Sequence, residues 1–99
     1  MRVTESIARV HYYTLDNTCG LSDVGEYGMS MEDRENVRIL EFPKTIRHDG
    51  KSYRVTRIWF SNYSGGVDVF PKLKKVKVPK ELEYELRMLK YSDIELVLY

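Results

Sequence analysis

The sequence predicts a mainly β (α+β) fold with one short C-terminal helix, and three observations predict it. The chain contains eight Tyr, three Phe and one Trp, and aromatic residues favour the pleated, half-buried surface of a sheet. Asp49-Gly50 lies between two segments of strand character, which is typical of a tight β-hairpin. Two segments of strand character are each followed by a proline: the β-branched and apolar Val37–Phe42, and Leu73–Val78, in which valines alternate with lysines. Proline cannot donate to a sheet ladder and therefore marks the end of a strand.

Length and composition indicate one folded domain. The chain has 99 residues, of which 42% are hydrophobic and 31% charged, which is too apolar for a disordered chain. Cys19 is the only cysteine, so no internal disulfide can form and a reduced, cytoplasmic location is expected. No apolar segment approaches the ~20 residues of a membrane span, and the N-terminus does not resemble a signal peptide.

The net charge of +1 conceals three blocks of different sign. Residues 1–36 carry three basic and seven acidic side chains, residues 37–80 carry eleven and three, and residues 81–99 carry two and five. We expect a single domain over residues 1–99, in which 1–36 is an acidic strand and loop segment. Residues 37–99 form a repeat-like β segment with the short helix.

The first third of the chain predicts little regular structure. Residues 9–15 favour a strand by residue type, although Ile7, Val10 and Thr14 also fit one helical face. Residues 16–36 contain many turn-forming and acidic residues, so we expect mostly loop with a short strand near 21–24.

The central segment predicts a strand followed by a hairpin. Residues 37–42 form a β-branched and apolar segment in which Leu40 and Phe42 are expected to point inward. A two-residue loop at Asp49-Gly50 places His48 opposite Lys51. The same register pairs Ile46 with Tyr53 across the strands.

The strand before Pro43 and the strand before Pro79 are similar at an offset of 36 residues. Six matched positions indicate an internal repeat. They pair Val37 with Leu73, Leu40 with Val76, Phe42 with Val78, Pro43 with Pro79, Lys44 with Lys80 and Ile46 with Leu82.

The remaining segments predict a loop, a helix and a strand. Residues 61–66 are a Ser/Gly-rich loop. Leu82, Leu86 and Leu89 recur at helical spacing, which predicts a helix over residues 80–90. Residues 94–99 form an apolar strand that is expected to pair with an earlier one.

Three strings resemble the BspA-type leucine-rich repeats: residues 40–46, residues 49–58 and residues 73–79. The Gly-Lys-x-Tyr-x-Val-Thr-x-Ile string at 50–58 is the most specific of them, and the resemblance covers about residues 10–82 of the chain. It implies a compact, leucine-rich-repeat-like β domain of about two repeat units. It also implies binding and adhesion at a cell surface, where that family usually acts.

The sequence contains no motif that indicates catalysis. Cys19 precedes Gly20 in an expected loop and could meet His11 as a nucleophile–base pair, but an incidental thiol is the simpler interpretation. His48 has only Asp49 nearby as an orienting carboxylate. The cysteine and the two histidines do not have zinc-ligand spacing, and no phosphate-binding glycine loop occurs. We therefore expect no enzyme activity, metal or cofactor.

Two groups of side chains are candidates for binding. Trp59, Phe60 and Tyr63 surround a loop, and rigid aromatics dominate interface hot spots, although Trp59 and Phe60 could instead be core. The second group is a basic stripe that could follow phosphates, or could be the charged protection of an edge strand. It consists of Arg54, Arg57, Lys72, Lys74, Lys75, Lys77 and Lys80.

These features predict a non-enzymatic macromolecule-binding module that acts through protein–protein contacts, and a small intracellular inhibitor is one form of it. One alternative is a phage or mobile-element anti-defence (anti-CRISPR-like) inhibitor of a nucleic-acid-guided machine. A second alternative is an RNA- or DNA-binding protein that uses the lysine strand. The expected partner is another protein or a ribonucleoprotein, with nucleic acid as the other possibility and no membrane.

Overall fold

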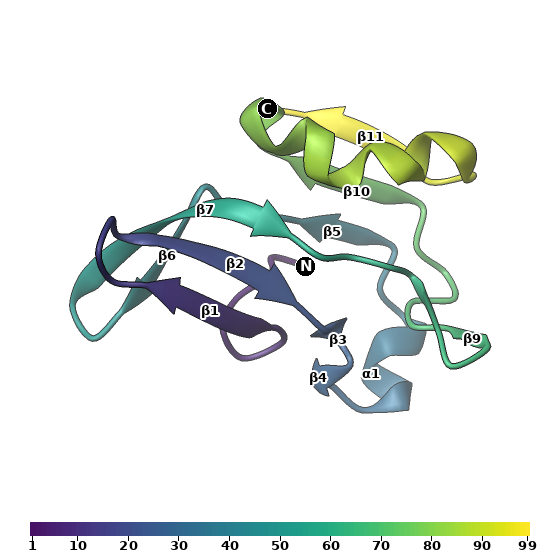
Figure 1. Cartoon of the computed structure of the whole chain (residues 1–99). Coiled ribbons are helices and arrows are strands. Elements are labelled where there is room, and N and C mark those ends of the chain that lie inside the picture. Colours follow the sequence, from purple (N-terminus) through teal and green to yellow (C-terminus); the bar gives the residue numbers. More distant parts are fainter.

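Two sheets form the walls of one hydrophobic core (Figure 1). The computed structural model describes residues 1–99 and is mainly β. One wall is a four-stranded sheet in the order β1-β2-β7-β6, and the other is a three-stranded sheet in the order β11-β10-β5. The elements are β1 Arg9–Tyr13, β2 Thr18–Ser22, β3 Val24–Gly25, β4 Tyr27–Gly28, α1 Met31–Glu35, β5 Ile39–Glu41, β6 Thr45–His48, β7 Lys51–Ile58, β8 Tyr63–Ser64, β9 Val67–Asp68, β10 Lys75–Val78, the 3₁₀ helix η1 Lys80–Tyr91, and β11 Glu95–Leu98.

The three-stranded sheet is parallel, and its register equals the repeat seen in the sequence. Leu40 pairs with Val76, which is 36 residues further along the chain. Both side chains are fully buried, and so are Phe42 and Val78 at the next matched position. The matched residues therefore lie side by side in one core layer. On the other side of β10, β11 adds a second parallel partner.

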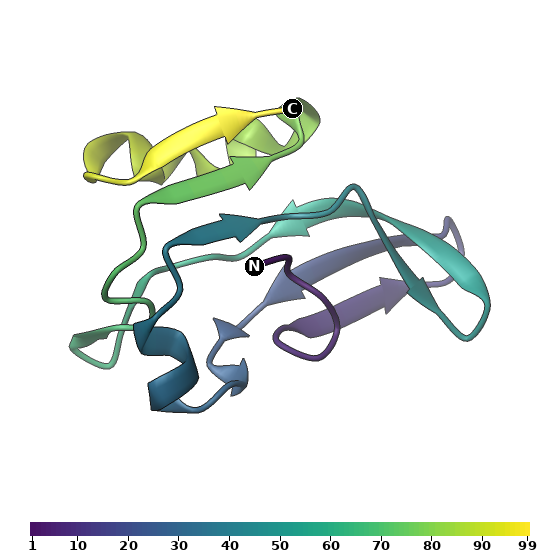
Figure 2. The same ribbon diagram turned by 180° about the vertical axis from the view of Figure 1, so that it is seen from behind.

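The four-stranded sheet mixes antiparallel and parallel pairs. β1 pairs with β2, and β6 with β7, both antiparallel, whereas β2 and β7 are parallel. Between β6 and β7, Asp49 and Gly50 both have positive φ, 50° and 75°. Ile46 lies opposite Tyr53 and His48 opposite Lys51. Figure 2 shows this pair of strands extending beyond the second sheet.

Nineteen buried hydrophobic residues form one cluster between the walls. The radius of gyration is 13.1 Å, close to the ~13 Å expected for a compact chain of this length. Close packing is visible at Gly25, which has φ +83° and where a Cβ would lie 2.3 Å from the Phe70 ring. Only glycine fits both constraints at this position.

The segment expected to be mostly loop, residues 16–36, is largely ordered in strands and a helix, so that expectation was wrong. β2 lies between β1 and β7, and Cys19 and Leu21 are fully buried there. The sheet neighbours supply this burial, which residue type alone does not indicate. Ser30 caps α1, because its Oγ accepts a hydrogen bond of 3.1 Å from the Asp33 N–H.

The C-terminal helical segment differs from the predicted regular helix. η1 covers residues 80–91 as a 3₁₀ helix, and the backbone of Leu86 departs from helical geometry with φ −116° and ψ 17°. Leu82 and Leu86 are nonetheless buried and Leu89 packs against the core. Neither helix of the chain has the length and apolar character of a membrane-crossing segment.

The interpretation of Lys75 and Lys77 as edge-strand protection was wrong. β10, which carries them, lies in the middle of its sheet between β5 and β11. Both lysines are half-buried on its outer face, while Val76 and Val78 point into the core. Alternation identified the two faces of the strand correctly, but it carries no information on the strand's place in the sheet.

We expect Phe42→Ala to lower the free energy of unfolding by about 3–5 kcal/mol, because it leaves a cavity where the two repeat copies meet. Ile39→Ala, in the same layer but on the outer face and 41% exposed, should change it by less than ~0.5 kcal/mol. Urea denaturation measures both changes in the free energy of unfolding, provided that the dependence of this free energy on urea concentration is the same in each variant. Equal losses in the two variants would contradict this account of the core.

Candidate functional site: an arginine and aromatic sheet face

Trp59 lies across the outer face of the four-stranded sheet. His11, Gly20 and Arg57 occupy one row across β1, β2 and β7, because His11 pairs with Gly20 and Gly20 with Arg57. The indole sits on Gly20, where a Cβ would come within 2.6 Å of the ring. Glycine at this position leaves the space in which the aromatic ring lies.

One backbone hydrogen bond and two side-chain contacts hold Trp59 in place. The Trp59 N–H of the backbone donates to the Leu21 carbonyl at 2.8 Å. The His11 ring stands nearly perpendicular to the indole, with centroids 5.6 Å apart. The Arg57 guanidinium lies 5.4 Å from the indole centroid, within cation–π range. Trp59 is still 45% exposed, so a rigid aromatic surface faces solvent.

Polar contacts orient the two neighbours of the indole. His11 Nε2 and Ser22 Oγ are 2.8 Å apart and share a hydrogen bond. Arg57 Nε lies 3.3 Å from Glu85 Oε1, and the same oxygen accepts a 3.2 Å hydrogen bond from the Ile58 backbone N–H. Glu85 therefore ties η1 to β7 and restrains the guanidinium beside Trp59.

The rest of this sheet face is basic. None of β1, β2, β6 and β7 contains an Asp or Glu. Asp23 and Glu85, which pair with Arg9 and Arg57, come from neighbouring segments. We call this surface the Trp59 face; its outward-facing members are Arg9, His11, Tyr13, Thr18, Gly20, Ser22, Thr45, Arg47, Ser52, Arg54, Arg57 and Trp59.

The other two predicted aromatic residues have different places. Phe60 is half-buried and stands edge to face against Phe42, with centroids 5.6 Å apart, so it belongs largely to the core. Tyr63 lies in the β8–β9 hairpin and is 65% exposed. Trp59 and Phe60 border one surface hollow of about 410 Å³. Phe60 also borders the next hollow, of about 480 Å³ beside η1, together with Tyr63.

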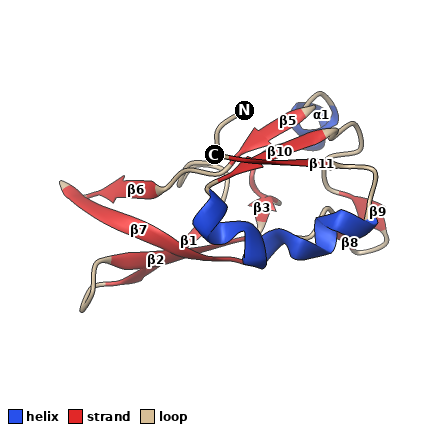
Figure 3. Cartoon of the chain, turned by 90° about the horizontal axis from the view of Figure 1, so that it is seen from above, coloured by secondary structure: helices blue, strands red, loops and turns tan.

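The structure separates the predicted basic stripe into two groups. Arg54 and Arg57 lie on the Trp59 face. Lys75 and Lys77 lie in β10, in the other wall (Figure 3), whereas Lys72 and Lys74 precede that strand and Lys80 begins η1. The core lies between the two walls, so the outward side chains of β7 and β10 point to different sides of the molecule. The neighbours of Lys75 and Lys77 in the sheet include Glu95 and Glu41.

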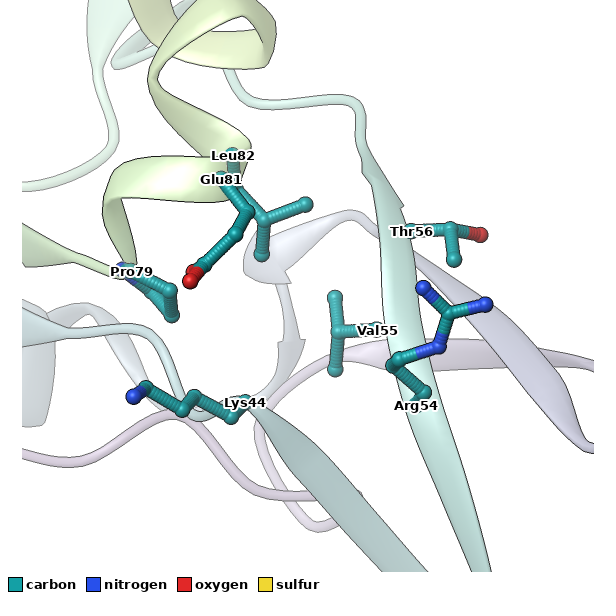
Figure 4. Close-up of a pocket in the computed structure, with 7 residues that line it drawn as sticks. All are labelled: Lys44, Arg54, Val55, Thr56, Pro79, Glu81 and Leu82. Atoms are coloured by element: carbon teal, nitrogen blue, oxygen red, sulfur yellow. The ribbon is translucent and has the colours of Figure 1, made fainter.

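A cleft of about 340 Å³ lies between β7 and the start of η1 (Figure 4). Arg54 and Lys44 line it together with Glu81, and Val55 and Leu82 supply apolar surface. Figure 4 shows the Glu81 carboxylate on the η1 side and Arg54 on β7. Arg54 thus borders both the cleft and the Trp59 face.

The sequence did not reveal a hydrogen-bonded cluster around Glu5. Glu5 Oε2 accepts from the Tyr12 hydroxyl and from His48 Nδ1, each at 2.9 Å, and His48 Nε2 lies 3.3 Å from Asp49. The Tyr12 and His48 rings stack at 4.5 Å. The expectation that Asp49 is the only carboxylate near His48 was therefore wrong, because Glu5 joins it from 43 residues away.

Two pKa values are shifted in this cluster. The Tyr12 hydroxyl, and then His48, lower the pKa of Glu5 by stabilising its carboxylate. Burial, and then the hydrogen bond to Glu5, raise the pKa of Tyr12. The cluster joins the N-terminal segment to the β6–β7 hairpin. Its charged side chains are partly solvated.

Cys19 is a core residue of β2 and lies in no loop, which corrects the expectation of a loop thiol near His11. Tyr12, and not His11, is its neighbour in β1. Its Sγ lies 3.8 Å from the Tyr53 carbonyl. Burial raises the pKa of the thiol to about 11, so at neutral pH it is not the thiolate that acts as a nucleophile.

Comparisons with protein-family models, with curated proteins and with solved structures find no match to this chain.

We expect Gly20→Ala to lift the indole from the sheet, because the new Cβ overlaps Trp59 and also approaches the Arg57 Cβ at 3.3 Å. Trp59 is the only tryptophan, so its emission should shift to the red and acrylamide should quench it more strongly. Gly65→Ala places a Cβ in open space but at φ +58°, so it adds backbone strain without an overlap and is the control for strain alone. An unchanged emission in Gly20→Ala would show that the indole does not rest there.

We expect Glu5 to contribute a pH-dependent part of the stability. Because its pKa is lowered in the folded state, its contribution is present above the ordinary value of 4.5 and is lost as the pH falls through the folded pKa. When the pH is lowered from neutral to acidic, the melting temperature of Glu5→Gln should therefore fall less than that of the native chain. Glu35→Gln, which changes a carboxylate without an ion pair, is the control. Identical acid profiles for Glu5→Gln and the native chain would contradict the role of Glu5.

Proposed function

We propose that the chain is a non-enzymatic macromolecule-binding module that acts through protein–protein contacts, with the Trp59 face as its contact surface. The proposal rests on one observation. His11, Gly20 and Arg57 form a row across three strands, and the indole of Trp59 is held across that row. Trp, Tyr and Arg are the residue types that dominate interface hot spots. Because contacts already restrain the indole, binding of a partner costs little further side-chain entropy.

The charge of the Trp59 face supports a partner with carboxylates at its contact surface. Arg47 and Arg54 are exposed and form no ion pair within 4.0 Å. Arginine is well suited to bidentate pairing with carboxylates. We propose a cytoplasmic setting and an inhibitor role for such a module, including inhibition of a nucleic-acid-guided machine as one specific form.

The likeness to BspA-type leucine-rich repeats remains part of this proposal. The parallel pairing of Leu40 with Val76 at the repeat spacing supports it, because stacked repeats place equivalent residues in adjacent layers.

Single-stranded nucleic acid is the second candidate partner. One observation favours it: Trp59 and Tyr13, each 45% exposed, lie on a sheet face with Arg54 and Arg57. Exposed aromatics on a basic surface stack bases while the cations contact phosphates. This surface differs from the lysine strand that the sequence indicated.

We expect Trp59→Ala to weaken capture of the partner at least about tenfold, because hot-spot truncation costs ~2 kcal/mol or more. The measurement is affinity capture from host lysate, quantified by mass spectrometry. Tyr91→Ala, which removes an aromatic residue that is 86% exposed on η1, is the matched control.

If Trp59→Ala and Tyr91→Ala capture the same protein equally well, the Trp59 face is not the contact surface. Treating the lysate with nuclease before capture separates the two candidate partners. Loss of capture after nuclease, together with binding that Arg54→Glu weakens and Lys75→Glu does not, favours nucleic acid over protein.

A further inference from the structure

β11 forms an unpaired edge of the parallel sheet. It pairs with β10 on one side and has no strand on the other. The Glu95 N–H donates to the Lys74 carbonyl and the Tyr99 N–H to the Val78 carbonyl, so alternate residues of the strand face β10. The backbone N–H and C=O groups of Leu96 and Leu98 therefore point outward, available to another strand.

This edge is short and carries one charged residue, Glu95, but it lacks the other features that usually prevent strand addition. Protected edges carry lysine, proline or a bulge, and β11 has none of these, since its register with β10 is continuous from Glu95 to Leu98. The core also becomes less covered toward it. Phe42, Val78 and Leu98 form one row across the three strands of this sheet. Phe42 and Val78 are 0% exposed, whereas Leu98, on the edge strand, is 41% exposed.

We propose that β11 is a docking edge for β11 of a second copy of this chain, paired antiparallel about a two-fold axis at Val97. A two-fold contact requires a segment that is complementary to itself. Leu96-Val97-Leu98 reads the same in both directions. With Val97 on the axis, Leu96 of each copy meets Leu98 of the other, and their outward N–H and C=O groups form the paired hydrogen bonds of an antiparallel ladder.

The charges and apolar side chains of the edge fit this arrangement. In this register Glu95 lies beside Tyr99 of the second copy and not beside another Glu95, and Lys75 flanks Glu95 within its own sheet. Leu98 gains a leucine neighbour on the core side, and the two Val97 side chains meet on the outer face. The dimer would join two three-stranded sheets into one continuous sheet of six strands.

Disulfide trapping tests the register. Val97→Cys on the axis would place the two Cβ atoms about 4.5–5.5 Å apart in a non-hydrogen-bonded pair, close to disulfide geometry. It should form an intermolecular disulfide under mild oxidation. Lys75→Cys, on the same face of the neighbouring strand, should not. The native Cys19 is fully buried. The unmodified chain, oxidised in the same way, measures the background of cross-linking through this cysteine.

Sedimentation equilibrium tests the dimer itself over about 10–500 µM, a range that brackets micromolar dissociation constants. The native chain should dimerise, and Leu98→Lys should raise the dissociation constant at least about tenfold, with circular dichroism confirming its fold. A native chain that is monomeric throughout, or a dimer that Leu98→Lys leaves unchanged, would overturn the proposal. So would equal cross-linking by Val97→Cys and Lys75→Cys. None of these readouts depends on the partner of the Trp59 face.

Discussion

The parallel pairing of β5 with β10 is the constraint on which the rest of the structure depends. It brings Leu40 against Val76 and aligns Phe42 with Val78, and all four side chains are fully buried. Each of the two strands is followed by a buried proline, Pro43 or Pro79, after which the chain turns toward the opposite side of the core. After Pro43 it continues through the hairpin into β7, and after Pro79 into η1. The two walls can therefore enclose one core only while this register holds.

Local signals in the sequence predicted those parts of the fold whose burial alternates along a single strand. The two proline-ended segments, the pairing of Ile46 with Tyr53 and the C-terminal strand lie where residue type and alternation placed them. β2 could not be predicted in this way. Its residues 18–21 are buried because β1 and β7 flank them, and Gly20 within it is a poor strand former. Tertiary neighbours, and not local propensity, decide such a segment.

The candidate site shows the same division between what one strand encodes and what the fold assembles. Trp59, Arg54 and Arg57 were identified from their residue types, but the seat of the indole on Gly20 depends on a register between β2 and β7 that includes a bulge. The contact of Glu5 with His48 spans 43 residues and has no local signal. The lysines appeared continuous with the arginines because alternation reveals the face of a strand and does not reveal to which sheet the strand belongs.

The positions of the two proposed contact surfaces determine how they would act together. β11 lies at the edge of the three-stranded sheet, whereas Trp59 lies on the outer face of the other wall, with the core between the walls. Pairing of two β11 strands therefore covers neither indole. A dimer would present two Trp59 faces in a fixed relative geometry. When a partner carries two matching sites, the second contact becomes intramolecular, and the apparent affinity exceeds that of one face without any new interaction. Edge pairing in one sheet would then increase the strength of binding through the other.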